Sequence, residues 1–496
     1  MVKIFYHYFV PTRMKEGVNI NDNNISQILD LIDENSSVTE VKVINDVKYV
    51  TIEKNIDHNM VCPCCGHKLY SKGKFIRHPN NQVLQDGYTL NTTVIGRRWK
   101  CSNEECDYTY TDTFNFIEKR KRQTKIIDFQ ILETLKDINL TCVQIAQKFK
   151  VSDTYVHQLF LRYVDLPRLE LTKYICIDEV YLNLSPDCKY ALIIMDFMTG
   201  DIIDIVRSRR KKYTENYFLS IPKTERDRVE CLCCDMYNPY INYTEQYFLH
   251  SVAVTDSFHV LQWLLHLINI YINDVKKKYQ ANDKKKRDEK NYQNNSDNKT
   301  IKDSKEVYIL KNFRWVLLES KKNIKYHESK YDYYLNMYVD TYQKETMFLK
   351  LDENFTAIRD FKELYEEFNE SYINDLDGAA ARLDELIDIY NESNIKLFRD
   401  FAQLLVKYKT SIINSFTYVK SLDGERLRRI SNGPLESFNK IVSMLRTLSH
   451  GVDNFDYVRS RILWHCRKNP PIRGIPKTRE EVHTPGKPRG PYNKNK

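Results

Sequence analysis

The sequence has no run of eighteen consecutive apolar residues, so no transmembrane helix is expected. Its first residues lack the basic, apolar and small-residue succession of a secretory signal. No internal repeat is found either. We therefore expect a soluble, cytoplasmic protein. In that compartment its 12 cysteines would not form a disulfide framework, and their spacing has to be read for metal ligands instead.

Positive charge is concentrated in two parts of the 496-residue chain, whose net charge is +9. Arg467–Lys496 holds nine basic residues against two acidic ones, and Lys276–Glu306 holds eleven against six. Because both segments are poor in large apolar residues, we expect them to be disordered or loosely ordered. Such segments favour a polyanionic partner, most simply nucleic acid, although charge alone fits plain solubility equally well.

Residues 1–118 are predicted to form an N-terminal region with a zinc ribbon. A short helix is expected at Ile25–Ile32, followed by a hairpin that turns at Asn45-Asp46. Two cysteine pairs then have the spacing of a tetrahedral structural Zn²⁺ site: Cys62 with Cys65, and Cys101 with Cys106. His67 is a possible substitute ligand.

Between the cysteine pairs lies a basic and aromatic strand. Its basic residues, suited to contacting DNA phosphates, are Arg97, Arg98 and Lys100. A merely solvated strand face fits that segment nearly as well.

Residues 119–168 are predicted to form a helix-turn-helix domain. The inward positions are Ile145, Ala146, Phe149, Val156 and Leu159, with Val151 in the turn and Ser152 capping the second helix. This leaves a set of side chains on the second helix for a DNA major groove: Thr154, Tyr155, His157, Gln158 and Arg162. Many three-helix folds without DNA have the same pattern, so DNA binding here is a hypothesis supported by the adjacent zinc ribbon.

The region from Tyr174 alternates apolar runs with helical segments, in the order of a ribonuclease-H-like α/β sheet. Asp178 and Asp235 each end such a run, and this layout places the first and fourth strands side by side. The two carboxylates would then meet. Asp256 follows a further strand and is either a fourth acid near the site or simply a strand-end residue, which is the interpretation we favour.

Glu436 lies in the first turn of a predicted helix, after Gly433 as N-cap and Pro434 at the first helical position. Together with Asp178 and Asp235 it can supply the carboxylates that two Mg²⁺ ions need. Ordinary surface acids are the alternative, and a helix start favours a carboxylate in any case.

The chain resembles the DDE transposases of bacterial insertion sequences, in particular the ISL-three family. The resemblance extends from the first cysteine pair to Trp464 and rests on these elements: the cysteine pairs, Ile177-Asp-Glu179, Asp235-Met236, Asp256-Ser-Phe-His-Val260, Ser431-Asn-Gly-Pro-Leu-Glu436 with Asn439, Gly451–Phe455 and Arg459–Ile462. It implies that Asp178, Asp235 and Glu436 bind the catalytic Mg²⁺ ions. It also implies that residues 169–466 form the catalytic domain, with a helical insertion at about 276–430.

The function implied is binding of the terminal inverted repeats of an insertion sequence, followed by Mg²⁺-dependent DNA strand cleavage and strand transfer. Double-stranded DNA, both transposon ends and target, is the expected partner, and pairing two ends calls for a homodimer or larger assembly in the bacterial nucleoid. Residues 467–496 would be a basic flexible tail, in which Arg489 sits in a weak match to a minor-groove AT-hook. A regulator that binds DNA without cutting, or a nuclease that cuts without joining, are the alternatives.

Overall fold

The computed structural model describes residue 33 and residues 35–45, 47–80, 89–118, 121–293, 303–448 and 454–482. The chain divides into two compact units, one formed by Met1–Asp165 with Asn469–Lys496 and the other by Leu166–Lys468. The helix expected at Ile25–Ile32 lies outside the described residues.

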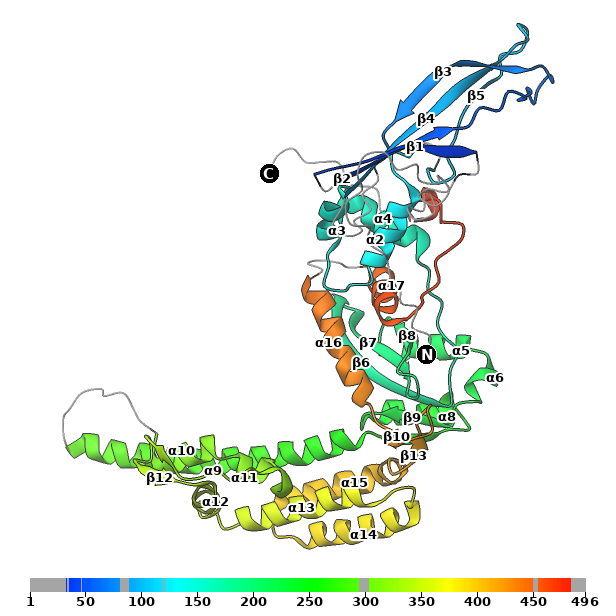
Figure 1. The fold of residues 1–496 in the computed structure, drawn as a ribbon. Coiled ribbons are helices and arrows are strands. Elements are labelled where there is room, and N and C mark those ends of the chain that lie inside the picture. The colour runs from blue at the N-terminus through cyan, green and yellow to red at the C-terminus, as the bar shows by residue number, and fades with distance from the viewer. Residues whose placement is uncertain are drawn as a thin grey trace, which may run out of the picture. The chain divides into compact units, whose positions relative to one another are not determined.

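The first unit contains a five-stranded sheet in the order β1-β2-β4-β3, with β5 paired to β4 (Figure 1). Its strands are β1 (Ser36–Ile44), β2 (Val47–Lys54), β3 (Leu69–Arg77), β4 (Thr89–Cys101) and β5 (Thr109–Thr111). The predicted hairpin is confirmed, because β1 and β2 pair antiparallel and Asn45 takes a positive φ of 47° in the turn. The sequence did not indicate that β2 also pairs with β4, in parallel, which joins the hairpin and the cysteine-bearing strands into one sheet.

Three helices of the first unit follow the sheet: α2 (Lys125–Thr134), α3 (Cys142–Phe149) and α4 (Asp153–Tyr163). All five residues predicted to face inward on α3 and α4 are buried. Thr141 and Gln144 form a capping box at the start of α3, and the Ser152 hydroxyl accepts a hydrogen bond from the backbone N–H of Tyr155 at 3.1 Å. The second helix therefore begins where the sequence predicts.

The second unit is built on a sheet in the order β10-β9-β6-β7-β8. Its strands are β6 (Tyr174–Ser185), β7 (Cys188–Asp196), β8 (Ile202–Val206), β9 (Cys231–Cys234) and β10 (Val252–Thr255). The predicted adjacency of the first and fourth strands is confirmed, since β6 and β9 pair in parallel. The sequence predicted that the first strand ends at Asp178, and this is wrong. Strand β6 continues beyond Asp178, because its antiparallel pairing with β7 extends further.

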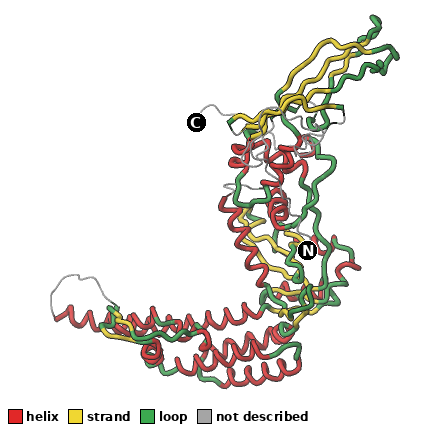
Figure 2. Tube along the Cα trace, in the orientation of Figure 1, coloured by secondary structure: helices red, strands yellow, loops and turns green. Residues whose placement is uncertain are grey.

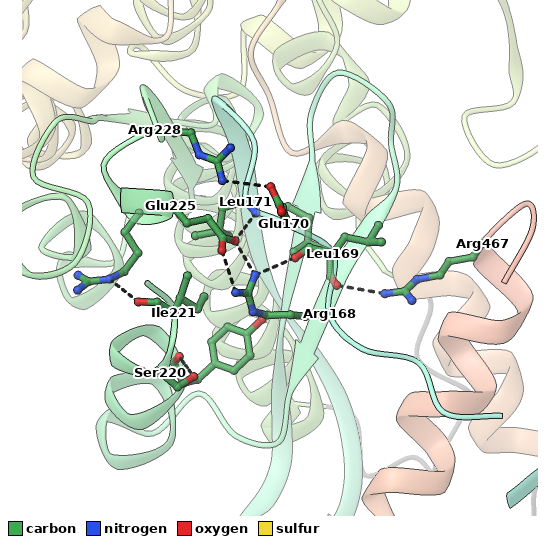
Figure 3. Close-up of polar contacts among 12 residues, drawn as sticks. Arg168, Leu169, Glu170, Leu171, Ser220, Ile221, Glu225, Arg228 and Arg467 are labelled. Atoms are coloured by element: carbon green, nitrogen blue, oxygen red, sulfur yellow. Dashed lines mark hydrogen bonds and ion pairs between the residues drawn. The ribbon is translucent and has the colours of Figure 1, made fainter. Parts of the chain in front are cut away.

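Helices flank this sheet or connect its strands: α5 (Lys211–Ser220), α6 (Lys223–Arg226), α7 (Asn238–Ile241), α8 (Tyr243–Gln246), α16 (Gly433–Leu448) and α17 (Phe455–Cys466). Helix α16 lies against β6 and α17 against β8. The linker into the sheet is held by Arg168, whose guanidinium makes two bonds to Glu225, at 2.5 and 2.9 Å (Figure 3). The N–H of Leu171 donates to the same carboxylate at 2.8 Å.

Between β10 and α16 the chain forms a helical insertion (Figure 2). Its helices are α9 (Ser257–Gln293), α10 (Lys305–Asn312), α11 (Trp315–Leu318), the 3₁₀ turn η1 (Lys321–Asn323), α12 (Thr341–Leu349), α13 (Phe355–Ser371), α14 (Leu376–Glu392) and α15 (Lys396–Asn414). Two small hairpins, which the sequence did not indicate, interrupt it: β11 (Lys330–Asp332) with β12 (Met337–Val339), and β13 (Tyr418–Lys420) with β14 (Leu427–Arg429). Helix α15 covers the edge strand β10, where Thr255 donates to the Ser411 hydroxyl at 2.7 Å.

Two expectations about disorder are wrong in part. Residues 276–293 continue helix α9, because lysine is a good helix former and the apolar stripe of the preceding turns fixes the helix on the insertion core. The basic tail is also ordered at its start. The Arg467 side chain donates to the carbonyl oxygen of Pro167 at 2.8 Å, and Arg473 and Lys477 both pair with Asp165 before the short helix α18 (Arg479–Val482).

Candidate functional site

Three aspartates occupy the same level on three neighbouring parallel strands: Asp178 lies within β6, and Asp235 and Asp256 directly follow β9 and β10. In the register of β6 and β9, Cys176 is opposite Cys233, so Asp178 and Asp235 are each two residues further along. In the register of β9 and β10, Thr255 is opposite Cys234, so Asp256 lies level with Asp235. The N–H of Asp256 donates to the carbonyl oxygen of Cys234 at 3.2 Å, which extends the pairing to this level. The sheet thus aligns three carboxyl groups in one row.

Burial, and to a lesser extent the neighbouring charges, shift the pKa values of groups in this row. Burial, and then the neighbouring Asp235 carboxylate, raise the pKa of Asp178 to about 6. Burial likewise raises the pKa of Asp256. His259, in the first turn of α9, lies with Nε2 2.9 Å from Oδ1 of Asp235, and this hydrogen bond is the main cause that raises its pKa to about 9.

Helix α16 brings Glu436 to the same end of the sheet. The helix begins at Gly433, one residue earlier than predicted, because the carbonyl oxygen of Asn432 accepts bonds from the N–H groups of Leu435 and Glu436. The predicted apolar face is buried: Leu435, Phe438, Val442 and Leu445. Glu436 is half-buried on another face of the helix.

Ligand-type atoms of Asp256, His259 and Glu436 all lie within 4.8 Å of one another. This group contains Glu436 of the predicted metal-binding residues, while Asp178 and Asp235 are outside it. Asp178 is instead held by Asn439, whose side-chain Nδ2 donates to its Oδ2 at 2.8 Å, and Nδ2 of Asn432 lies 3.4 Å from Oδ1 of Asp235.

Three buried oxygen atoms here have no hydrogen-bond partner within the described part of the chain: Oδ2 of Asp256, Oδ1 of Asn432 and Oδ1 of Asn439. All three are acceptors, so the surroundings have more acceptor capacity than the protein can satisfy with donors. A divalent cation with its water ligands supplies what such a group of oxygens needs. The residues present therefore fit a metal ion.

A comparison with known families identifies the family of the chain. The model of the ISL-three DDE transposase family, described as a transposase, matches residues 175–462, more than half of the chain. The chain belongs to this family. None of the curated proteins matches it. In the described residues of this transposase, no helix is both long and apolar enough to cross a membrane.

The transposase carries a second group of potential metal ligands in its first unit. The sulfur atoms of Cys62, Cys65, Cys101 and Cys106 all lie within 4.8 Å of one another, an arrangement compatible with a zinc site. Cys62 and Cys101 are buried beside Trp99, whereas Cys64 is exposed. His67 does not belong to the group, and its Nδ1 lies 3.2 Å from the carbonyl oxygen of Cys65.

The residues predicted to contact DNA differ in their exposure and in the hydrogen bonds and ion pairs that they make within the protein. Thr154 and Arg98 are exposed. Tyr155 donates its hydroxyl to Asp128 at 2.5 Å, and Nε of Arg162 donates to the Lys477 carbonyl oxygen at 2.8 Å. Arg97 pairs with Glu53 at 3.8 Å.

The remaining predicted DNA contacts are placed as follows. His157, Gln158 and Lys100 are half-buried, and Arg489 lies outside the described residues.

Sequence reasoning did not assign Asp256 and His259 to the group around Glu436. A signal was present: both Asp235 and Asp256 follow four-residue apolar strands, and His259 is three positions beyond Asp256, one helical turn away. Asp256 is a strand-end residue, as expected, but it also belongs to the ligand group.

Proposed function

We propose that this transposase binds the terminal inverted repeats of an insertion sequence and catalyses Mg²⁺-dependent DNA strand cleavage and strand transfer. Its catalytic residues would be Asp178, Asp235 and Glu436. The observation that carries the proposal is the level placement of Asp178 and Asp235 on the paired strands β6 and β9, with Glu436 delivered to the same end of the sheet by α16. Converging carboxylates are what a phosphoryl-transfer site with two metal ions requires.

Asp178, Asp235 and Glu436 would hold the Mg²⁺ ions. When bound, these ions lower the pKa of the attacking water or DNA 3′-hydroxyl and stabilise the leaving oxygen. The protein itself would orient the carboxylates for metal binding. Asn439 orients Asp178, and Asn432 orients Asp235. Glu179, beside Asp178, accepts bonds from Tyr240 and Arg209 and is therefore occupied elsewhere.

We assign the catalytic unit, residues 169–466 with its helical insertion, to the ribonuclease-H-like class. Three antiparallel strands followed by two parallel ones, joined through helices, support this assignment. Residues 1–118, with a structural Zn²⁺, and the helix-turn-helix at 119–168 would read the terminal repeats. The exposed Thr154 and Arg98 are the side chains best placed to reach DNA, and the Thr154 hydroxyl also donates to Oδ1 of Asp153 at 3.4 Å. The tail beyond Val482, with Arg489, would add contacts to the phosphate backbone.

The experiment uses the full-length chain with a linear DNA that carries the inverted repeats bracketing its own gene, in Mg²⁺. We expect specific end binding, release of a 3′-hydroxyl at the element end and joining of that end to a second DNA. Binding without cleavage would identify a regulator derived from a transposase. Cleavage without joining would identify a nuclease. Size-exclusion chromatography of the protein bound to two ends tests the expected dimer.

A further inference from the structure

The Asp256 carboxyl group is buried without being satisfied. The residue is 1% exposed, and Oδ1 accepts a bond from the N–H of Phe258 at 3.2 Å. Its Oδ2 has no hydrogen-bond partner among the described residues. Burying an unpaired carboxylate oxygen is costly unless something opposite it carries positive charge. No basic side chain donates to this oxygen within the described residues, the nearest being His259, whose Nε2 lies 3.9 Å away.

Ligand-type atoms of His259 and Glu436 lie close to the Asp256 carboxyl group. One atom from each of Asp256, His259 and Glu436 lies within 4.8 Å of the other two. A cation with ligands at about 2.0–2.2 Å spans roughly 4 Å between opposite donors, so a single ion needs only a small contraction of this group. The three donors come from the end of β10, the first turn of α9 and the first turn of α16, so they are supplied by three different elements.

We propose that Asp256, His259 and Glu436 form a mixed oxygen and nitrogen site for a divalent cation, in which His259 is a direct ligand through Nε2. The inference rests on the proposed function, because the ion it describes would be one of those that serve strand cleavage. It adds two ligands, Asp256 and His259, to the carboxylates at Asp178, Asp235 and Glu436.

The imidazole ligand determines which cation the site prefers. Mg²⁺ strongly favours oxygen ligands, whereas first-row transition ions accept imidazole nitrogen as well, with affinity rising from Mn²⁺ onward. A site with one nitrogen among its donors therefore binds Mn²⁺ more tightly than Mg²⁺. Replacing His259 by a residue without this nitrogen reduces the difference in affinity between Mn²⁺ and Mg²⁺.

A purely structural role for His259 is the competing explanation. In it, Nε2 serves only as the donor to Asp235, 2.9 Å away, and ties α9 to the end of β9. A nitrogen atom that donates its proton to Asp235 cannot offer the same lone pair to a metal. The two roles thus differ in a directly observable way, namely whether a nitrogen atom is bonded to the ion.

The test is pulsed electron paramagnetic resonance of Mn²⁺ bound to the full-length, zinc-loaded protein without DNA. Zinc is silent in this measurement because its d-shell is filled. We expect a ¹⁴N coupling to Mn²⁺ in the wild type, its loss in His259→Gln, and Mn²⁺ binding weaker by on the order of tenfold or more in Asp256→Asn. His266→Gln is the matched control, because His266 is exposed on the same helix. Circular dichroism checks that each variant is folded.

The outcomes separate this inference from the proposed function. Absence of the ¹⁴N coupling in the wild type, or its persistence in His259→Gln, overturns the inference even if the protein cuts and joins DNA. A coupling that is lost in His259→Gln and retained in His266→Gln supports it, even if the protein fails to cleave.

Discussion

Nδ2 of Asn439 donates a hydrogen bond to Oδ2 of Asp178 at 2.8 Å across 261 positions of the sequence. The bond joins helix α16 to strand β6 and fixes the orientation of a carboxyl group whose pKa is raised to about 6. The same helix carries Glu436 one turn earlier. A single contact therefore couples the placement of two proposed metal-binding residues.

Asn439→Ala should leave end binding unchanged and lower the rate of strand cleavage at saturating Mg²⁺ by about ten- to a hundredfold. A hydrogen bond to a charged group contributes roughly 1.5–3 kcal/mol, and each 1.4 kcal/mol is a factor of ten in rate. Single-turnover cleavage kinetics measure the effect. Ser437→Ala, at an exposed position of the same helix, is the control and should cleave like the wild type. Equal rates for both variants would remove Asn439 from a positioning role.

The four-cysteine group should hold one zinc ion per chain. Cys101→Ser should abolish zinc binding, because a tetrahedral structural site loses a ligand, and should make the first unit sensitive to proteolysis. Cys64→Ser is the matched control, because Cys64 is exposed between Cys62 and Cys65 and outside the four-cysteine group. Metal analysis by mass spectrometry and limited trypsin digestion report the two effects. Loss of zinc from Cys64→Ser, or its retention in Cys101→Ser, would contradict the assignment.

Glu225→Gln should destabilise the catalytic unit by about 2 kcal/mol at neutral pH, because it weakens the paired bonds to Arg168. The Arg168 hydrogen bonds hold the pKa of Glu225 below its usual value, so this stabilisation exists above the unfolded-state pKa, near 4.5, and is lost as the pH falls through the folded-state value. Urea unfolding of wild type and variant at pH 7 and in acid checks both statements.

The exposed pair of Arg228 with Glu170, 3.1 Å apart, provides the control for that measurement (Figure 3). Glu170→Gln should change the free energy of unfolding by less than about 0.5 kcal/mol, because exposed ion pairs contribute little. A loss as large as that of Glu225→Gln would contradict the role given to the Arg168 bonds.

Two neighbouring substitutions on α4 should separate recognition from stability. Thr154→Ala should weaken binding to the specific ends by about 1 kcal/mol or more and leave the unfolding free energy unchanged, because the side chain is exposed. Tyr155→Phe should lower the free energy of unfolding and leave end binding unchanged, because the Tyr155 hydroxyl donates to Asp128 inside the first unit. Electrophoretic mobility shifts and thermal unfolding distinguish the two. A loss of end affinity confined to Tyr155→Phe would make that hydroxyl the DNA contact.

Much of the local structure follows from the sequence. The apolar runs at Tyr174 and Val229 predicted the strands that carry Asp178 and Asp235, and the meander order correctly predicted that these strands adjoin. The position of Pro434 predicted the start of α16 to within one residue. Short-range patterns were sufficient for the apolar runs and the helix start, because both depend on neighbouring residues. The adjacency of the first and fourth strands followed from the ribonuclease-H-like strand order instead.

What the sequence could not provide depends on register and on distant packing. The level of Asp256 beside Asp235 requires the pairing of β9 with β10, and the approach of His259 requires the direction in which α9 leaves the sheet. The side chains of Arg467 and Arg473 are held in place by hydrogen bonds to residues about 300 positions earlier in the sequence. The high charge of the basic tail suggested disorder, but these long-range hydrogen bonds order its first residues.

The central claim is most directly tested by Mg²⁺-dependent cleavage at an element end by Asp178→Ala, Asp235→Ala and Glu436→Ala, with end binding measured in parallel. Each variant should bind the end like the wild type and lose cleavage by on the order of a thousandfold. Glu245→Ala, at an exposed acid of the same unit, should keep both activities. Wild-type cleavage by any of the three variants would contradict the account by removing that carboxylate from the catalytic site.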